Sequence, residues 1–250
     1  MGLLFRLFRR LFYFVLLVFI APALVSLGIW EAQADRPTSW SNANWSSASI
    51  LPPPDETDDA AVYVMAARTG RWKGAFSVHS WIVVKRRNAA QYQRYDKVGW
   101  GSPIRRNAYA ADANWYSNAP VIVKSFHGNF ASNLIPQIEK AIEAYPHSER
   151  GDYQIWPGPN SNSFIAHVLN AVPDMGVVLP ANAVGRDFPT NSGFVQVDPD
   201  WSNVQFNIHG YFGVAMGKRS GIEIQFFGLV AGIQFEKPAL KLPGIGNVYL

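Results

Sequence analysis

Three residues that lie far apart in the sequence have the types needed for nucleophilic catalysis: Ser161, His79 and Asp96. Ser161 follows Asn160 at the predicted start of a helix, where free backbone N–H groups and the helix dipole can stabilise an oxyanion. His79 lies in a predicted strand and could serve as the base for Ser161, while Asp96 orients its ring. The sequence therefore predicts a catalytic triad for hydrolysis of an amide or ester, or for acyl transfer.

Each of these residues also has a purely structural interpretation. Ser161 can cap the helix, which is the commoner use of serine at such a position. His79 can be a hydrogen-bonded core histidine. Asp96 is close to Arg94 and Lys97 in the sequence and can be a surface charge. Because serine is a weak nucleophile without a well-placed base, the residue types alone leave both interpretations open.

Other kinds of site are not indicated. The chain contains no cysteine, which excludes disulfides, thiolate metal sites and a cysteine nucleophile. The five histidines, at positions 79, 127, 147, 167 and 209, form no HxxxH pair and no cluster with carboxylates. A Walker loop, a GxGxxG fingerprint and a GxSxG elbow are absent as well. We therefore expect no metal and no cofactor.

The formal net charge of +4 does not indicate nucleic-acid binding. Three of the 22 basic residues, Arg6, Arg9 and Arg10, lie at the extreme N-terminus. From residue 11 onward the chain has 19 basic and 18 acidic residues. This balance leaves no basic face for a phosphate backbone, so no nucleic-acid partner is expected.

Residues 11–30 are uncharged and consist mostly of Leu, Phe, Val and Ile. Twenty helical residues are about 30 Å long, which is the thickness of a bilayer core. The positive-inside rule places the preceding arginines in the cytoplasm and the rest of the chain outside. We expect residues 1–34 to be a single-pass anchor in the inner membrane, with the lipid bilayer as partner and the domain in the periplasm. A cleaved signal peptide, indicated by Ala32-Gln33-Ala34, is the alternative.

The segments that must position the candidate residues follow this anchor. Residues 35–59 are rich in Ser, Asn and Pro and should form a flexible linker, although Trp40 and Trp45 could instead cap the surface of the domain. Residues 60–250 should be the exported domain, with a core at 60–200 and a β extension at 201–250.

The hydrophobic pattern predicts an α+β fold with a mainly antiparallel sheet and two helices. Strands are expected at 61–67, 76–85, 91–100, 121–126 and, shorter, at 152–156. Alternation within 76–85 places His79 and Trp81 on one face. Helices are expected at 129–144, with Pro136 in the first turn, and from Asn160 or Ser161 to about residue 172. From residue 204 the pattern alternates with a period of two, which predicts a C-terminal β meander.

The order of histidine strand, polar strand and nucleophile helix resembles the circularly permuted papain-like proteins. This branch of the NlpC/P60 superfamily includes lecithin:retinol acyltransferase-like enzymes and PPPDE-type peptidases. Their helix opens with Asn-Cys-x-His/Thr-Phe. Here it opens with Asn160-Ser161-Asn162-Ser163-Phe164, which puts Ser161 in the place of the cysteine. The resemblance covers residues 60–172 and implies a permuted papain-like core with hydrolase or acyl transferase activity.

A second resemblance covers nearly the whole exported part. It rests on HSWIVVK at 79–85, GWG at 99–101, WPGPNSNSF at 156–164, AVGRD at 183–187 and PALKLPG at 238–244. These motifs resemble an uncharacterised bacterial family of unknown function, DUF3750, which implies no activity. Two functions therefore remain: a membrane-anchored envelope hydrolase or acyl transferase with an envelope substrate, or a non-catalytic binding or scaffold domain with a protein partner on a degenerate papain-like fold.

Overall fold

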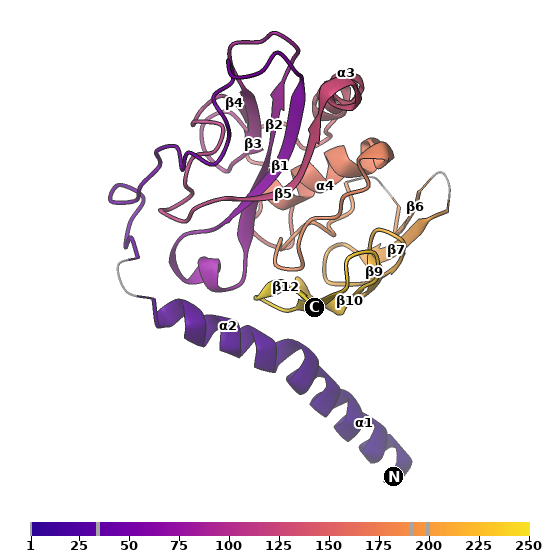
Figure 1. The fold of residues 1–250 in the computed structure, drawn as a ribbon. Helices are drawn as coiled ribbons and strands as arrows, with labels where there is room; N and C mark the ends of the chain where they lie inside the picture. The colour runs from indigo at the N-terminus through magenta and orange to yellow at the C-terminus, as the bar shows by residue number, and fades with distance from the viewer. Residues whose placement is uncertain (1, 34–35, 191–192, 199–200) are drawn as a thin grey trace.

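The computed structural model of the chain describes residues 2–33, 36–190, 193–198 and 201–250. It shows an N-terminal helix and an α+β domain with two antiparallel sheets (Figure 1). The first sheet has the strand order β4-β3-β2-β1-β5, and the second runs from β12 to β6 in uninterrupted chain order. The predicted α+β class is confirmed. Ala34 and Asp35, at the boundary expected between anchor and linker, lie outside the described residues.

The N-terminal helix consists of α1 (Gly2–Val15), a π-helical turn η1 (Leu16–Ile20) and α2 (Ala21–Glu31). The π-helical turn ends two residues before Pro22, whose missing N–H interrupts the regular hydrogen bonds of the helix. The 30-residue run is long and apolar enough to cross a membrane by length and composition, a test that N-terminal signal sequences also pass.

The first sheet carries the candidate histidine. Its strands are β1 (Ala61–Arg68), β2 (Val78–Lys85), β3 (Gln93–Lys97), β4 (Ile104–Arg106) and β5 (Val121–His127). In the β1–β2 pair Met65 lies opposite Trp81 and Ala67 opposite His79. Because strand residues alternate between faces, His79 and Trp81 share one face, as predicted. That face is covered by an aromatic cluster that includes Trp115.

The opposite face of this sheet packs against two helices, α3 (Gly128–Glu143) and α4 (Ser161–Ala171). Ile82 from β2 and Phe164 from α4 are fully buried in this main core. The 3₁₀ turns η2 (Arg71–Ala75) and η3 (Pro173–Met175) lie before β2 and after α4. The start of α4 lies next to the start of the central strand β2, where the Asn162 amide donates to the carbonyl of Val78.

Residues 36–59 lie against the domain, whereas their composition predicts a flexible linker. Trp45 packs edge-on against Trp115 with ring centroids 5.1 Å apart. The Asp112 carboxylate accepts a hydrogen bond from the backbone N–H of Ile50 at 2.8 Å. Aromatic packing and backbone hydrogen bonds hold a segment that lacks periodic apolar positions. The alternative placement of Trp45, as a cap on the domain, matches the structure.

The second sheet confirms the predicted meander. Its strands are β6 (Val195–Val197), β7 (Asn203–Ile208), β8 (Phe212–Gly217), β9 (Gly221–Phe226), β10 (Leu229–Gln234), β11 (Ala239–Leu242) and β12 (Gly246–Tyr249). Its inner side carries buried ionic groups: the Glu223 carboxylate accepts hydrogen bonds from Arg186, at 2.6 Å, and from Lys241. Arg186 belongs to the AVGRD motif, so this ion pair joins the second sheet to the core.

Two local expectations are wrong. Residues 152–156 form no strand, because the backbone N–H of Gln154 donates to the carbonyl of Pro159 at 2.8 Å and closes a loop. Pro136 lies inside α3 and not in its first turn. The neighbouring Ile135 and Ile138 are buried, and their packing offsets the hydrogen bond that proline cannot donate.

Candidate functional site

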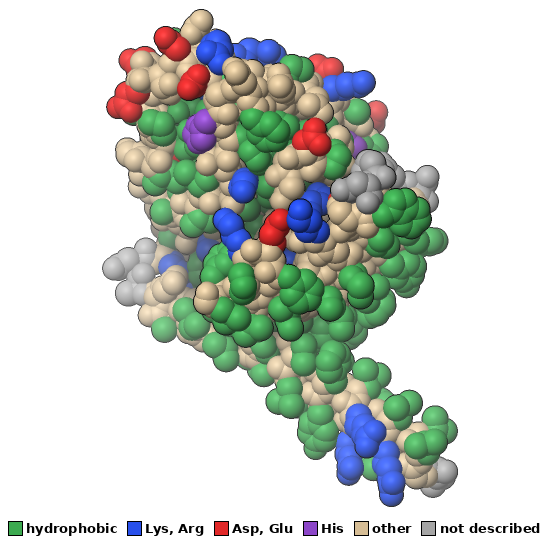
Figure 2. All heavy atoms as spheres, turned by 45° about the vertical axis from the view of Figure 1, so that its right-hand side comes forward, with side chains coloured by type: hydrophobic (Ala, Val, Ile, Leu, Met, Phe, Trp, Pro, Cys, Tyr) green, Lys and Arg blue, Asp and Glu red, His purple; other side chains and the backbone are tan. Residues whose placement is uncertain are grey.

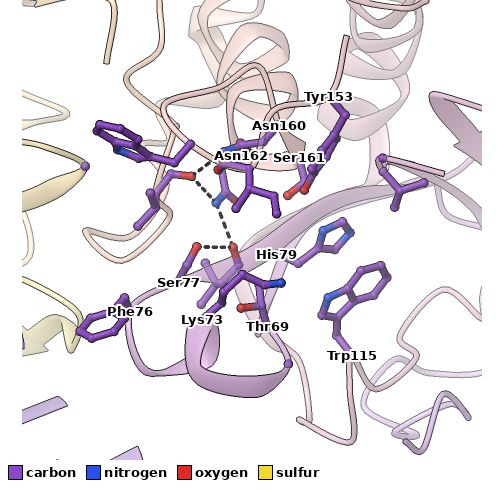
Figure 3. A pocket seen from close by; sticks show the side chains of 18 of the residues that line it. Thr69, Lys73, Phe76, Ser77, His79, Trp115, Tyr153, Asn160, Ser161 and Asn162 are labelled. Atoms are coloured by element: carbon purple, nitrogen blue, oxygen red, sulfur yellow. Dashed lines mark hydrogen bonds between the residues drawn. The ribbon is translucent and has the colours of Figure 1, made fainter. Parts of the chain in front are cut away.

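A cavity of about 640 Å³ lies where the start of β2 meets the start of α4 (Figure 3). His79 and Ser161 both line it. Eight of its other lining residues are aromatic: Trp72, Phe76, Trp100, Trp115, Tyr116, Tyr153, Trp156 and Phe227. The structure therefore brings two of the three predicted catalytic residues to one apolar cavity.

Asn160 caps α4, and this leaves Ser161 without a capping role. The Asn160 side chain accepts hydrogen bonds from the backbone N–H groups of Asn162, at 2.8 Å, and Ser163, at 3.1 Å. The Ser163 hydroxyl in turn accepts from the backbone N–H of Asn160 at 2.7 Å, which completes a capping box. The structural interpretation of Ser161 as the helix cap is thus wrong, because its neighbours make those bonds.

The start of α4 is tied to the strand that carries His79. The Asn162 amide donates to the carbonyl of Val78 at 2.9 Å and to that of Val184 at 2.8 Å. The backbone of Gly185 passes so close to Asn160 that a Cβ there would lie 2.2 Å from the Asn160 amide nitrogen. Gly185 also has a φ of +90°, so glycine is needed on both counts. These contacts fix Ser161 relative to β2.

His79 is held from two sides. Its Nε2 lies 3.3 Å from Oδ2 of Asp96. Its ring stacks face to face on Trp115, with centroids 3.6 Å apart and planes within 2°. Only 2% of His79 is exposed. The carboxylate and the indole therefore fix the imidazole in one orientation.

Asp96 is fully buried and is no surface charge. Its Oδ2 accepts hydrogen bonds from Arg105 at 2.9 Å and from Arg94 at 3.5 Å, in addition to His79. Arg105 is the direct cross-strand partner of Asp96 on β4. Burial alone would raise the pKa of Asp96, but the hydrogen bond from His79 and the two guanidinium groups outweigh it and hold the pKa well below its usual value.

Burial lowers the pKa of His79 to about 4, although Asp96 acts in the opposite direction. The imidazole is therefore neutral at pH 7. Because an ionised Asp96 can only accept, the hydrogen must be on Nε2, which leaves Nδ1 with a free lone pair. No protein group in the described ranges bonds Nδ1. This tautomer is the one that a base with Nδ1 as its acceptor requires.

Ser161 lies beside Tyr153 at the start of α4 and lines the same cavity as His79 (Figure 3). Burial raises the pKa of the Tyr153 phenol, and hydrogen bonding to Ser161 partly offsets that rise. Within the described part of the chain no hydrogen bond joins Ser161 to His79. Catalytic hydrogen bonds are often long in unliganded enzymes and shorten when substrate binds.

Three residues of the site carry no recognisable signal in the sequence. Trp115 lies in a loop without periodic pattern, Tyr153 lies in the segment expected to be a strand, and Arg105 lies on the unexpected strand β4. Arg94 lies two residues before Asp96, a spacing that puts both side chains on one face of a strand.

The site offers a hydroxyl, a neutral imidazole and a buried carboxylate. Among residues 2–33, 36–190, 193–198 and 201–250, no group of three or more His, Asp or Glu side chains is placed to hold a metal ion. Such a set of groups suits proton transfer from an alcohol and attack on a carbonyl.

Comparison with known proteins identifies a family that this chain matches. A family model described as a protein of unknown function, DUF3750, matches residues 59–188. No curated protein and no solved structure matches the chain. The matched range includes β1 to β5, both domain helices and every candidate residue, whereas the second sheet lies beyond it.

Proposed function

The chain belongs to the DUF3750 family of unknown function, and we propose from the site itself that it is a membrane-anchored hydrolase or acyl transferase of the cell envelope. In this proposal Ser161 is the nucleophile, His79 the base and Asp96 the group that orients it. The main observation in support is that the neutral imidazole of His79, fixed by Asp96, lines the same cavity as Ser161 in the first turn of α4.

The proposed reaction is acyl transfer from an amide or ester. The Ser161 oxygen attacks the carbonyl carbon while Nδ1 of His79 takes the hydroxyl proton. The histidine then returns that proton to the departing amine or alcohol, which leaves an acyl-serine. Water or an acceptor alcohol or amine then attacks the acyl-serine and frees Ser161. The positive end of α4 stabilises the oxyanion of each tetrahedral intermediate.

The fold-level part of the proposal is a permuted papain-like core with serine in place of cysteine. It is supported by the order of β2, β3 and α4 in the chain and by the cavity that β2 and α4 both line. Serine needs a stronger base than cysteine does, and the two guanidinium groups near Asp96 disfavour a charged His79. Slow turnover is therefore expected.

A fluorophosphonate probe tests the proposal on the full-length chain in detergent. We expect covalent labelling of the wild type and none of Ser161→Ala. Ser77→Ala is the matched control, because Ser77 lines the same cavity but is bonded to the carbonyl of Val78 at 3.1 Å. Labelling that persists in Ser161→Ala, or a folded wild type that resists the probe, contradicts the catalytic proposal.

A non-catalytic binding domain is the second candidate, and the aromatic walls of the cavity favour it. Trp72, Trp100 and Trp156 are 65%, 46% and 40% exposed and line a space large enough for a drug-sized apolar ligand. If this candidate is correct, the wild type resists the probe, yet a fluorescent fatty-acid analogue binds and Trp156→Ala weakens that binding. Binding unaffected by Trp156→Ala contradicts it.

A further inference from the structure

The second sheet has its apolar side facing outward. Six residues form one row of cross-strand neighbours from β7 to β12: Val204, Met216, Ile222, Ile233, Leu240 and Val248. They are exposed by 37% to 63%. The strand residues next in register on this side of β7 to β10 are apolar as well. Figure 2 shows hydrophobic side chains gathered over the lower part of the domain and continuing onto the N-terminal helix.

The inner side of the same sheet is polar and buried. Asn207, Glu223, Gln225 and Lys241 are each at most 3% exposed. An antiparallel sheet with one solvated face normally buries the apolar side and exposes the polar one. This sheet does the reverse, so its outer side needs apolar surroundings. An exposed apolar surface that extends over several strands is unusual for a monomer in water.

The N-terminal helix packs against this part of the domain. Phe19 contacts Phe226 on β9, with ring centroids 5.6 Å apart. The Ser26 hydroxyl donates to the carbonyl of Ala75 at 2.5 Å, and Trp30 is buried against η2. The helix therefore contacts the domain from residue 19 to residue 30.

The side of α2 that faces away from the domain is apolar and exposed. Leu24, Val25 and Ile29 are each 55% to 58% exposed. If residues 11–30 cross a bilayer, these side chains contact lipid. Residues 19 to 30 extend about 16 Å along the helix, which is about half of a bilayer core. The domain that packs beside this stretch then lies at the depth of one leaflet.

From these observations we propose that the outward side of the second sheet inserts among the lipid acyl chains of the leaflet on the domain's side. The occupant is the bilayer, because the sheet adjoins a helix whose free side has the same apolar character at the same depth. The inference rests on the anchor of the proposed function, and it is independent of catalysis by Ser161.

Because the chain contains no cysteine, a thiol-reactive label attaches only to a cysteine introduced by mutation. Met216→Cys and Ile222→Cys each place a single cysteine on the outward side of the sheet, and Leu24→Cys places one on the anchor. Lys140→Cys, on the exposed side of α3, is the control for a position in water. Each labelled full-length protein, carrying the fluorophore NBD, is reconstituted in vesicles of phosphatidylethanolamine and phosphatidylglycerol. Circular dichroism verifies that each variant is folded.

We expect nitroxide-labelled lipids to quench the fluorescence at positions 216 and 222 as strongly as at position 24, and aqueous iodide to quench only position 140. Iodide quenching at 216 and 222, together with lipid quenching at 24, overturns the insertion while leaving the anchor intact. Protection from both quenchers with cross-linking between copies identifies a second chain as the occupant and also overturns it. Absence of lipid quenching at position 24 contradicts both the membrane anchor and the insertion of the sheet. Labelling of Ser161 by fluorophosphonate tests catalysis separately.

Discussion

Replacing Asp96 by asparagine removes one negative charge from a point where three side chains converge on a single oxygen. Oδ2 of Asp96 lies 3.3 Å from Nε2 of His79 and accepts hydrogen bonds from Arg105 at 2.9 Å and from Arg94 at 3.5 Å. The side chains of Asp96 and Arg94 are each 1% exposed, and that of Arg105 is 12% exposed. Asp96→Asn keeps the shape but leaves the buried guanidinium of Arg94 and the partly buried one of Arg105 without a counter-charge.

Removal of one partner from a buried ion pair costs about 3–5 kcal/mol. Arg94 keeps its hydrogen bond to the carbonyl of Ala110 at 3.0 Å and its position over the Trp81 ring, 4.1 Å from the centroid. We therefore expect Asp96→Asn to lower the free energy of unfolding by about 3 kcal/mol, at the low end of that range. Asp58→Asn is the control, because residue 58 is exposed and a surface change of this kind stays within about 0.5 kcal/mol.

Urea titration of the full-length protein in detergent, followed by circular dichroism and tryptophan fluorescence, measures these changes. The double variant Asp96→Asn/Arg105→Gln should lose less stability than the two single variants together, by about 1 kcal/mol or more, because the second change removes an unpaired charge. A loss of less than about 1 kcal/mol for Asp96→Asn would refute the idea that this carboxylate balances the buried cations. If the site is catalytic, probe labelling of Asp96→Asn should also fall by about 10⁴-fold, because the amide no longer selects the Nε2–H tautomer of His79.

Three more predictions concern other parts of the molecule. The pKa of His79 is about 4 in the folded protein and about 6.5 when unfolded, so the unfolded state binds more protons between these values. Stability should therefore be full above about pH 6.5 and decline as the pH falls towards 4, and urea titrations should show a shallower decline for His79→Gln. Limited proteolysis should spare residues 36–59, because their backbone bonds to the domain; rapid cleavage there, as expected of a free linker, would count against this packing. A phosphatase fused after Leu250 should be active in the periplasm, and activity only of a reporter that requires the cytoplasm would reverse the proposed orientation.

The elements that carry the candidate site follow from local sequence signals. Alternation in β2 gives the shared face of His79 and Trp81, because neighbouring strand residues must point to opposite sides. Asn160 marks the start of α4, because its amide oxygen can accept from the free N–H groups of the first turn. Both signals depend on residues that are close together in the sequence, so a single sequence is enough to recognise them.

The surroundings of the site depend on contacts that no local pattern encodes. Trp115 reaches His79 from a loop, and Arg105 reaches Asp96 across a three-residue strand. The segment around Trp45 is polar in composition, so the sequence leaves a free linker and a cap on the domain as alternatives, and the contact between Trp45 and Trp115 decides between them. The period of two from residue 204 predicts the meander, but alternation does not tell which side of each strand faces the core.

The direct contact between helix and domain sets the range over which the site can act. Ser26 is bonded to Ala75, and a Cβ at Gly74 would lie 2.2 Å from the Trp30 ring, so the helix and the domain are in direct contact. A domain on a long tether can reach molecules at a range of distances from its anchor. A domain in direct contact with its anchor stays beside it and diffuses laterally with it in the membrane plane. With the anchor in a bilayer, the cavity meets only molecules that travel in that plane or come down to it, and polymers far from the membrane stay out of its reach.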